Sequence, residues 1–421
     1  MGKRELIIIG AGAAGMFAAV SAAQNGVSVL LLEKMEKAGR KIRITGKGRC
    51  NITNMKDWNE FSSHIHPKSL FFKPAFYNFS SSETVRFFES IGLSTVIERG
   101  DRVYPRSGQS KDVVEYLVKH LLSLGVEILY NSKVIDIQCN NNKVERVVWS
   151  KNGTKHAEET KAVIVATGGL SYPSTGSDGD GYLFAKRLGH NVTECWPSLT
   201  ALMPGNYNTE LEGLKLKNVE IELYIGGNPA QSERGDLEFT NNGIEGPIGF
   251  KISRKAVKAM KNGEKIYTVI DLKPALTEEQ VTNRIKRELK ENGVLRTWNL
   301  LNLLLPKQLV SPFLISNKIK VEKYVSVNDD KMVNLLAKTL KYWKLDIDKY
   351  TSYERAVVTA GGVSLDEIVS KNMSSKLCSN LFFAGEVIDL DADTGGYNLQ
   401  IAFSTGYMAG KEAAHLIQKS R

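Results

Sequence analysis

The chain has 421 residues, of which 42% are hydrophobic and 24% are charged, an ordinary composition for a folded protein of two or three structural units. Its net charge of +10 favours anionic partners in general, without choosing between nucleic acid, a membrane surface and small anionic ligands. The four cysteines lie far apart and form no CxxC pair, which argues against a disulfide framework and a zinc site and favours a reducing cytoplasm.

The N-terminal segment follows a strand–helix–strand pattern. Glu5–Gly10 is a short apolar run typical of a strand buried on both faces, Ala13–Asn25 is an Ala-rich helix closed by Gly26, and Val27–Glu33 is a second buried strand. This order predicts a parallel sheet. The basic start and apolar run imitate a signal peptide, but the glycines that interrupt the run indicate a folded unit retained in the mature protein. No other stretch is long and apolar enough to insert into a membrane.

A glycine motif joins the first strand to the first helix. Gly10 allows a tight turn, Gly12 lets the backbone approach a pyrophosphate, and Gly15 lets helix and strand pack closely. The helix N-terminus then offers N–H groups and a positive dipole end to phosphates. Glu33, at the end of the next strand, is placed to bind ribose hydroxyls and disfavours NADP. FAD and NAD both remain open, and the alternative is a tight turn without a ligand.

The next segment, residues 39–54 ("GRKIRITGKGRCNITN"), carries five cations, three glycines and Cys50 but no carboxylate. It follows the strand that ends at Glu33, so we expect it to lie near the phosphates of a dinucleotide. A nucleic-acid patch would need a broader basic face with aromatic stacking positions. Cys50 could be reactive beside so many cations, but a small buried residue is the favoured interpretation. We expect ligand contacts from Arg40, Lys41 and Arg49, and solvation of Arg43 and Lys47.

The chain then predicts two amphipathic helices, Ser82–Ile91 and Ser110–Leu124, and a β-hairpin turning on Asn140–Asn142. A buried strand, Ala162–Gly169, runs into a glycine- and serine-rich loop that leads to a helix. The carboxyl edge of a parallel sheet is where ligands bind, so this loop is a second candidate wall of the site.

The composition changes after about Cys195. Short alternating strands such as Val219–Ile225 are followed by a charged helix, Thr277–Asn292, and an apolar helical stretch, Leu295–Leu305. We therefore predict an inserted region within a discontinuous cofactor-binding domain. The expected boundaries are 1–195 and 356–421 for the cofactor domain, 196–275 and 306–355 for a β-rich domain, and 276–305 for a small helical domain.

The C-terminal part returns to the first pattern. Leu381–Glu386 is a buried strand, and Gly395 and Gly396 begin a helix that runs to Lys419 with small residues along one face. The N-terminus of this helix would stabilise negative charge on a reduced flavin. None of the six histidines lies in these motif blocks, and the carboxylates of the nearby loop are more often solvated or capping than catalytic, so no catalytic residue is assigned.

Taken together, these motifs make the chain resemble the bacterial NAD(P)/FAD-dependent oxidoreductases that include aminoacetone oxidase and BaiN-type 3-dehydro-bile-acid reductases. The resemblance covers nearly the whole chain, and its most specific blocks are residues 39–54 and Gly235–Ser253. It implies an α/β fold, with a Rossmann-like FAD-binding domain and its parallel sheet interrupted by an inserted β-rich domain and a small helical domain. Within the second block, the family usually reads closer to "GELLFTHxGxSGP". Here Asn241, Asn242 and Glu245 depart from it, which puts an inherited substrate preference in doubt.

The resemblance also implies a set of FAD contacts. These are Gly10, Gly12, Ala14, Gly15, Glu33, Lys34, Arg40, Lys41, Gly48, Arg49, Cys50, Asn51, Val134 (adenine side), Thr167, Gly168, Tyr172, Gly385, Glu386, Asn398, Leu399 and Gln400.

The resulting hypothesis is an FAD-dependent oxidoreductase that transfers a hydride between flavin N5 and a small organic substrate, as an ene-reductase or an amine oxidase. NAD(P)H is the candidate transient reductant. The expected partner is a small molecule rather than nucleic acid. The alternatives are an NAD-dependent dehydrogenase, which would need a catalytic His or Lys beside the nicotinamide, and a nonenzymatic flavin- or RNA-binding protein.

Overall fold

The computed structural model describes residues 4–421. The chain forms two compact units, of which unit 1 holds the chain up to Trp196 together with Val357–Arg421, and unit 2 holds Pro197–Ala356. No helix within residues 4–421 combines the length and the hydrophobicity that a membrane span requires.

Unit 1 is built on a five-stranded parallel sheet, as the buried apolar runs predicted. Its strand order is β22-β11-β1-β2-β7, and every pairing in it is parallel. The strands are β1 (Leu6–Ile9), β2 (Val29–Leu32), β7 (Glu127–Leu129), β11 (Ala162–Val165) and β22 (Leu381–Phe383). Strands β1, β2 and β11 and the edge strand β22 have no polar face, because helices and loops cover both sides of the sheet. The predicted Rossmann-like fold is confirmed.

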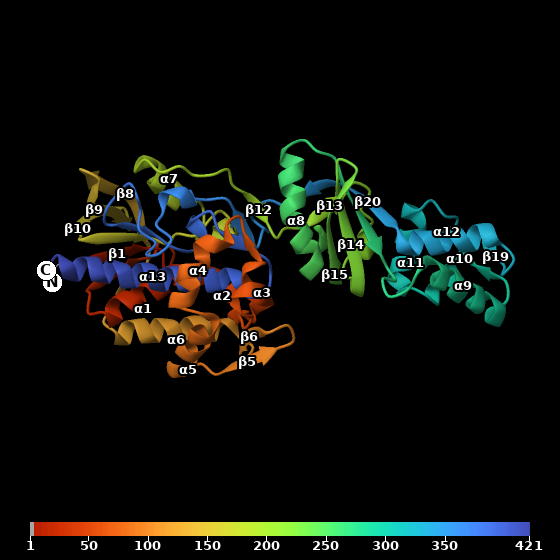
Figure 1. The fold of residues 1–421 in the computed structure, drawn as a ribbon, viewed down its shortest axis with the longest axis horizontal. Coiled ribbons are helices and arrows are strands. Elements are labelled where there is room, and N and C mark those ends of the chain that lie inside the picture. The colour runs from red at the N-terminus through yellow and green to blue at the C-terminus, as the bar shows by residue number, and fades with distance from the viewer. Residues whose placement is uncertain (1–3) are drawn as a thin grey trace. The chain divides into compact units, whose positions relative to one another are not determined.

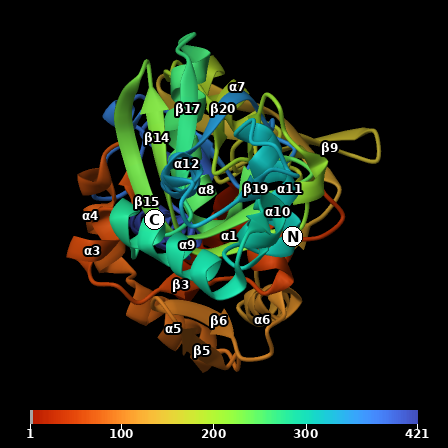
Figure 2. The ribbon, with the colours of Figure 1, turned by 90° about the vertical axis from the view of Figure 1, so that its right-hand side faces the viewer.

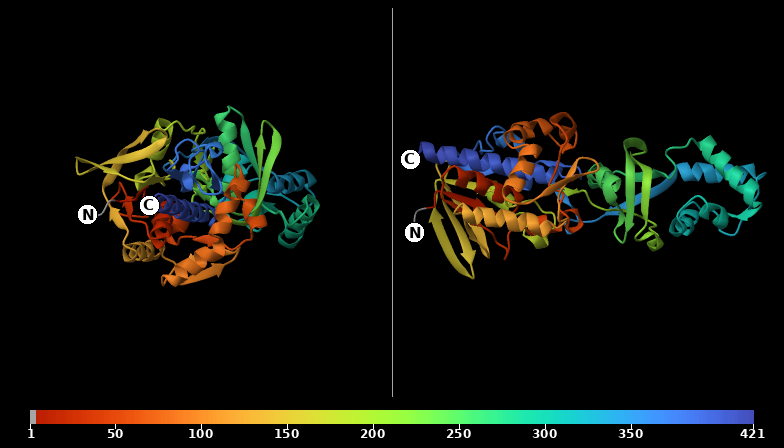
Figure 3. Two further views of the ribbon diagram at one scale, coloured as in Figure 1. Left: turned by 60° about the vertical axis from the view of Figure 1, so that its left-hand side comes forward. Right: turned by 90° about the horizontal axis from the view of Figure 1, so that it is seen from below.

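Two long helices, α1 (Ala13–Gln24) and α13 (Tyr397–Lys419), pack side by side in unit 1 (Figures 1 and 3). Their closeness depends on glycine. A Cβ atom on Gly406 would lie 2.2 Å from the carbonyl oxygen of Ala14, and one on Gly410 would lie 2.1 Å from that of Ala18. The small-residue face of α13 is therefore a packing surface for α1, and it brings the N-terminal and C-terminal segments of unit 1 into contact.

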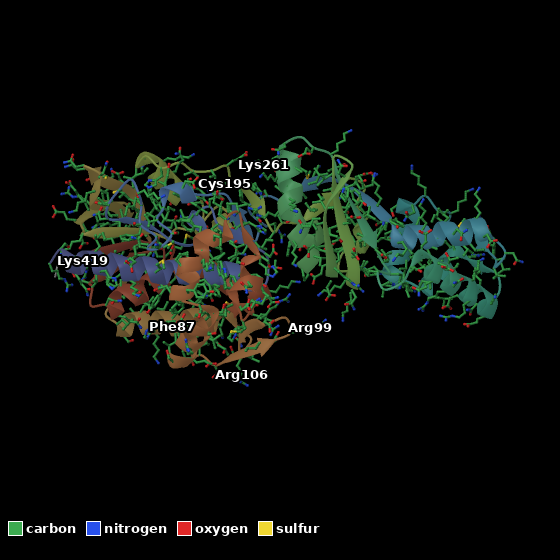
Figure 4. All side chains as sticks on the ribbon, viewed as in Figure 1. Phe87, Arg99, Arg106, Cys195, Lys261 and Lys419 are labelled. Carbon is green, nitrogen blue, oxygen red and sulfur yellow. The ribbon has the colours of Figure 1, made fainter. Side chains whose placement is uncertain are left out.

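The remaining elements of unit 1 surround the sheet, and Figure 4 places Phe87 on α5 and Arg99 and Arg106 at the two ends of the β5–β6 hairpin. The helices are α2 (Arg40–Ile44), α3 (Trp58–Ser62), α4 (Ser69–Asn78), α5 (Ser81–Ser90), α6 (Ser110–Ser123) and α7 (Asp180–Arg187). The strands are β3 (Thr53–Asn54), β4 (Ile65–His66), β5 (Thr95–Glu98), β6 (Arg102–Pro105), β8 (Ser132–Asn140), β9 (Lys143–Lys151), β10 (Thr154–Glu159), β12 (Trp196–Ser198, at the unit boundary), β21 (Val358–Ala360) and β23 (Asp391–Ala392).

Unit 2 contains a closed antiparallel barrel with the order β13-β16-β15-β14-β17-β20, in which β14 pairs with both β15 and β17 (Figure 2). The strands are β13 (Leu202–Pro204), β14 (Lys215–Ile225), β15 (Asn228–Thr240), β16 (Gly243–Glu245), β17 (Ile266–Asp271) and β20 (Trp343–Tyr350). Helix α8 (Gly246–Lys261) packs against β15. The block Gly235–Ser253 thus spans the end of β15, all of β16 and the start of α8.

A helical segment follows the fifth barrel strand in sequence. It comprises α9 (Glu278–Asn292), α10 (Thr297–Asn302), α11 (Lys307–Ser316) and α12 (Asp330–Lys341), with the short pair β18 (Leu295–Arg296) and β19 (Tyr324–Val325). Helices α11 and α12 lie within the range 306–355 that the sequence interpretation gave to the β-rich domain. The difference arises because short apolar runs such as those around Phe313 and Leu336 suit a strand or a helix equally well.

Candidate functional site

A cavity opens at the carboxyl edge of the parallel sheet in unit 1. Its wall is formed where the chain leaves β1, β2, β11 and β22, with the first turns of α1 and α13 completing it. Parallel strands bring their carboxyl ends to one edge, so segments far apart in sequence meet there. This arrangement brings all four sequence motifs to one place.

The glycines of the loop after β1 have two different roles: one allows close packing, and another leaves room for a ligand. A Cβ on Gly15 would lie 1.8 Å from the carbonyl oxygen of Gly10, so Gly15 is required for close packing. Gly12 differs, because a Cβ there would meet no protein atom within 4 Å and its φ is −82°. Neither packing nor backbone conformation requires glycine at this position, and Gly12 lines the cavity. Its missing side chain leaves room for a ligand.

Two helix N-termini open on this cavity without a side-chain cap. Gly12 caps α1 and Gly396 caps α13, and no side chain accepts a hydrogen bond from the first turn of either helix. Asn398 and Leu399, in the first turn of α13, line the cavity. Uncapped N–H groups and two positive dipole ends suit a ligand that carries negative charge at two places.

Glu33 is buried at the end of β2 beside the glycine loop. Burial raises the pKa of this carboxyl, although it accepts hydrogen bonds from the backbone N–H groups of Met35 and Ala11, each at 2.8 Å. The two backbone bonds fix the orientation of the carboxylate at the cavity wall. Its remaining lone pairs can accept hydrogen bonds from ribose hydroxyls.

A partly buried polar network joins residues from distant motifs. Lys41 Nζ lies 2.7 Å from Glu386 Oε2 and donates to the hydroxyls of Ser171 and Ser177 at 2.9 and 3.0 Å. Glu386 also accepts from the Ser171 hydroxyl at 2.6 Å and from the Thr359 backbone N–H at 2.8 Å. Burial would raise the pKa of Glu386, but the attraction of Lys41 and these hydrogen bonds lower it below its usual range. The network fixes the cavity wall where segment 39–54 meets the strand end after β22.

Most of the sequence-predicted contacts line this cavity: Gly10, Gly12, Ala14, Glu33, Lys34, Arg40, Lys41, Val134, Thr167, Gly168, Gly385, Glu386, Asn398 and Leu399. The others do not: Gly15, Gly48, Arg49, Cys50, Asn51, Tyr172 and Gln400. For several of the second group, the structure gives a different role.

Arg49 forms an ion pair with Glu98, and its guanidinium lies 4.3 Å from the ring centroid of Tyr104. Cys50 is fully buried, and burial raises the pKa of its thiol to about 12, which makes it the inert core residue favoured by the sequence interpretation.

Gln400 is also fully buried, and its side-chain amide is used within the protein. Its carbonyl oxygen accepts from Thr53 and Thr84 at 2.5 and 2.9 Å, and its nitrogen donates to the Phe79 carbonyl oxygen and the Ser404 hydroxyl. Gln400 therefore anchors α13 to the elements around it.

The structure adds a polar cluster that the sequence interpretation missed. His64 Nδ1 lies 2.9 Å from Asp393 Oδ2, His66 Nε2 lies 3.4 Å from Asp393 Oδ1, and the His64 ring stacks on Tyr397 with centroids 4.3 Å apart. Asn398, which lines the cavity, donates to the Asp393 carbonyl oxygen. Burial would raise the pKa of Asp393, but hydrogen bonds from His64 and His66 lower it to about 2. The cluster therefore does not line the cavity itself but contacts Asn398, which does.

An Asp393→Asn variant is expected to lower the free energy of unfolding by about 2 kcal/mol near neutral pH. The folded pKa of Asp393 lies below that of an unfolded aspartate, so its contribution is complete above about pH 4 and is lost as pH falls toward about 2. Urea unfolding of both proteins between pH 6 and 2.5 measures the difference. Asp366→Asn, at an exposed pair with Lys68, is the matched control. An unchanged gap between wild type and Asp393→Asn across this range would contradict the assignment.

The residues of the cavity fit a flavin dinucleotide. The uncapped start of α1 and the open space at Gly12 suit the pyrophosphate, Glu33 suits the adenosine ribose, and the uncapped start of α13 suits an electron-rich ring system. All the residues that line this cavity belong to unit 1. The fold and cavity together define a Rossmann-type dinucleotide-binding protein.

Comparison with known proteins gives the family. Residues 4–412 match the HI0933-like protein Rossmann domain family, and the chain belongs to this family. It is 30% identical to the 3-dehydro-bile acid delta(4,6)-reductase of Clostridium scindens, over 97% of this chain and 98% of that protein. It is 31% identical to the ribosomal RNA dihydrouridine synthase of Haemophilus influenzae, over 96% of each chain.

Among solved structures, the fold is similar to that of the 3-ketosteroid delta1-dehydrogenase from Sterolibacterium denitrificans. The TM-score is 0.55 at 14% identity, covering 99% of this chain and 100% of that chain. The predicted family resemblance and the prediction of an FAD-dependent oxidoreductase are confirmed.

Proposed function

We propose that the protein reduces a carbon–carbon double bond conjugated to a carbonyl group, with FAD as its redox cofactor and NADH or NADPH as the reductant. Two relatives matched over almost their whole length support the direction of the reaction. One is named for reduction of a 3-dehydro bile acid at delta(4,6), and the other for making dihydrouridine, a uridine reduced at its C5–C6 bond. Both named reactions saturate a double bond in conjugation with a carbonyl, which favours an ene-reductase over an amine oxidase.

One structural observation carries this proposal: two uncapped helix N-termini and a buried glutamate lie on one cavity. A bound flavin supplies hydride transfer through its N5 atom. The first turn of α1 and Gly12 would hold the pyrophosphate, and Glu33 would orient the ribose. The positive end of α13 favours negative charge on the reduced ring. Lys41 and Glu386 keep the wall between these parts rigid and pair their charges with each other.

The substrate we favour is a small enone. A uridine in ribosomal RNA is the second candidate, because the H. influenzae relative matches as fully as the C. scindens relative and because the chain carries a net charge of +10. Both substrates present the same conjugated unit. They differ in size and charge, so one assay can compare them.

The test begins with the purified protein, anaerobically, in stopped flow. We expect a yellow protein whose flavin is bleached by NADH or NADPH. Its colour should then return when a 3-oxo-delta4 steroid is added. If a uridine-containing ribosomal RNA fragment reoxidises the flavin and mass spectrometry detects dihydrouridine, the substrate is the RNA uridine and not the enone. Bleaching by primary amines with no response to either acceptor would contradict the reductase. A colourless protein that added FAD does not restore would overturn the cofactor assignment.

A further inference from the structure

Two cysteines that the cofactor site does not use lie close together in unit 1. Cys139 Sγ, near the end of β8, and Cys378 Sγ, in the loop before β22, are 3.6 Å apart. The residues are 239 positions apart in sequence, so the fold alone brings them together. Cys139 is exposed and Cys378 is buried. A pair with one accessible and one shielded thiol has the arrangement of an attacking and a resolving cysteine.

The backbones on either side of the two thiols are fixed to each other. The Asn380 side chain accepts from the Val144 backbone N–H at 2.7 Å and donates to the Val144 carbonyl oxygen at 2.8 Å. Val144 is the cross-strand partner of Cys139 in the β8–β9 hairpin. The Ser379 N–H donates to the Asn142 carbonyl oxygen at 3.0 Å. The short separation of the sulfurs is therefore imposed by hydrogen bonds on both chains.

The local environment of Cys378 also restrains its side chain. Its backbone N–H donates to the Ser375 hydroxyl at 2.9 Å, and that hydroxyl is 2.8 Å from the buried ring nitrogen Nε2 of His190. Burial and the neighbouring Cys139 raise the pKa of the Cys378 thiol to about 12, so it is a slow nucleophile at neutral pH. Cys139 is the sulfur that meets an oxidant first.

We propose that Cys139 and Cys378 form a reversible disulfide by exchange with a low-molecular-weight disulfide. Cys139 thiolate attacks one sulfur of the small disulfide, a mixed disulfide forms, and one small thiol leaves. The sulfur of Cys378 then loses its proton to solvent and attacks Cys139 Sγ, and the second small thiol leaves. The protein gives up two thiols, and one small disulfide is reduced to two thiols.

The bond would tie the β8–β9 hairpin to the segment that enters β22. That strand leads directly into Gly385 and Glu386 of the cavity wall. Because the cross-link closes a long loop, it restricts the unfolded chain more than the folded one. Oxidation is therefore expected to stabilise unit 1 against unfolding.

The experiment treats the full-length protein with oxidised glutathione. Free thiols are counted, non-reduced peptides are mapped by mass spectrometry, and thermal unfolding is recorded. We expect a loss of two of the four thiols, a linked peptide pair containing Cys139 and Cys378, and a higher Tm that dithiothreitol reverses. The rate of ring closure should rise with pH, because Cys378 must lose its proton. Flavin content should stay the same in both redox states.

Two variants make the result specific. Cys139→Ser changes an exposed side chain and should abolish the link, leaving Cys378 as a free thiol. Cys195→Ser, at a cysteine outside this pair, should behave like the wild type. A stable glutathione adduct on Cys139 with Cys378 still free at alkaline pH would overturn the proposal, as would a link to Cys50 or Cys195 or a link between two chains.

Discussion

A Gly12→Val variant is expected to fold normally and to lose its flavin. A Cβ atom at this position would meet no protein atom within 4 Å, and the backbone angle is one that any residue adopts, so we expect the fold to accept valine. The same side chain would occupy the space where the backbone approaches the pyrophosphate. Crowding of this kind costs about 1–3 kcal/mol, which weakens binding by roughly 5- to 150-fold, and we expect the upper end because valine adds three carbon atoms.

Flavin absorbance, fluorescence titration with FAD and circular dichroism measure this result. Gln24→Val is the matched control, because Gln24 is exposed at the last turn of the same helix. It should retain flavin and structure. Gly15→Val should fail to fold, since the Gly10 carbonyl oxygen occupies the position of its Cβ. A yellow Gly12→Val protein with unchanged FAD affinity would contradict the assignment of the cavity.

A Lys41→Met variant is expected to lower the free energy of unfolding by about 3 kcal/mol. The substitution leaves the partly buried Glu386 carboxylate at the cavity wall without its cation, and breaking a fully buried pair on one side costs about 3–5 kcal/mol. Partial exposure of Lys41, whose side chain is 25% accessible, places the expectation at the lower end. Denaturant unfolding with the flavin removed isolates this effect from cofactor binding.

The double variant Lys41→Met/Glu386→Gln separates pairing from simple loss of a side chain. It should recover part of the lost stability, because no buried charge then remains uncompensated. Lys68→Met is the matched control at the exposed pair with Asp366, and it should cost less than about 1 kcal/mol. Equal losses in the single and double variants would mean that Lys41 and Glu386 do not act as a pair.

The sequence was most informative where structure is local. The turn from Gly10 to Gly15 and the acid at Glu33 lie within one strand–helix–strand unit, and the spacing of apolar runs is enough to predict it. The parallel character of the central sheet followed from the same signals, but its strand order did not. The sequence predicted the cavity only in outline, as the place where four motifs meet. That prediction relied on the rule that the carboxyl ends of parallel strands lie at one edge of a sheet.

Other features depend on contacts that no local pattern contains. His64 and Asp393 are separated by 329 residues, and neither lies in a sequence motif that names the other. Gln400 lies within a block that the family resemblance assigns to flavin binding. Its side-chain amide instead forms hydrogen bonds with Thr53, Thr84 and the Phe79 carbonyl oxygen, which are all more than 300 residues away in sequence. A His and an Asp brought together by a short β pairing, β4 with β23, give no signal to a single sequence.

The contact between α1 and α13 has a consequence for how the protein is made. Part of the cavity lining comes from residues 9–14 and part from residues 384–402, which are made much later. At about 5–20 residues per second, the strand–helix–strand unit waits on the order of tens of seconds on the ribosome for its partner helix. Meanwhile the barrel and the helical segment of unit 2 emerge and can fold. The cavity can therefore form only after the chain has been made at least as far as Ala402, the last residue that lines it.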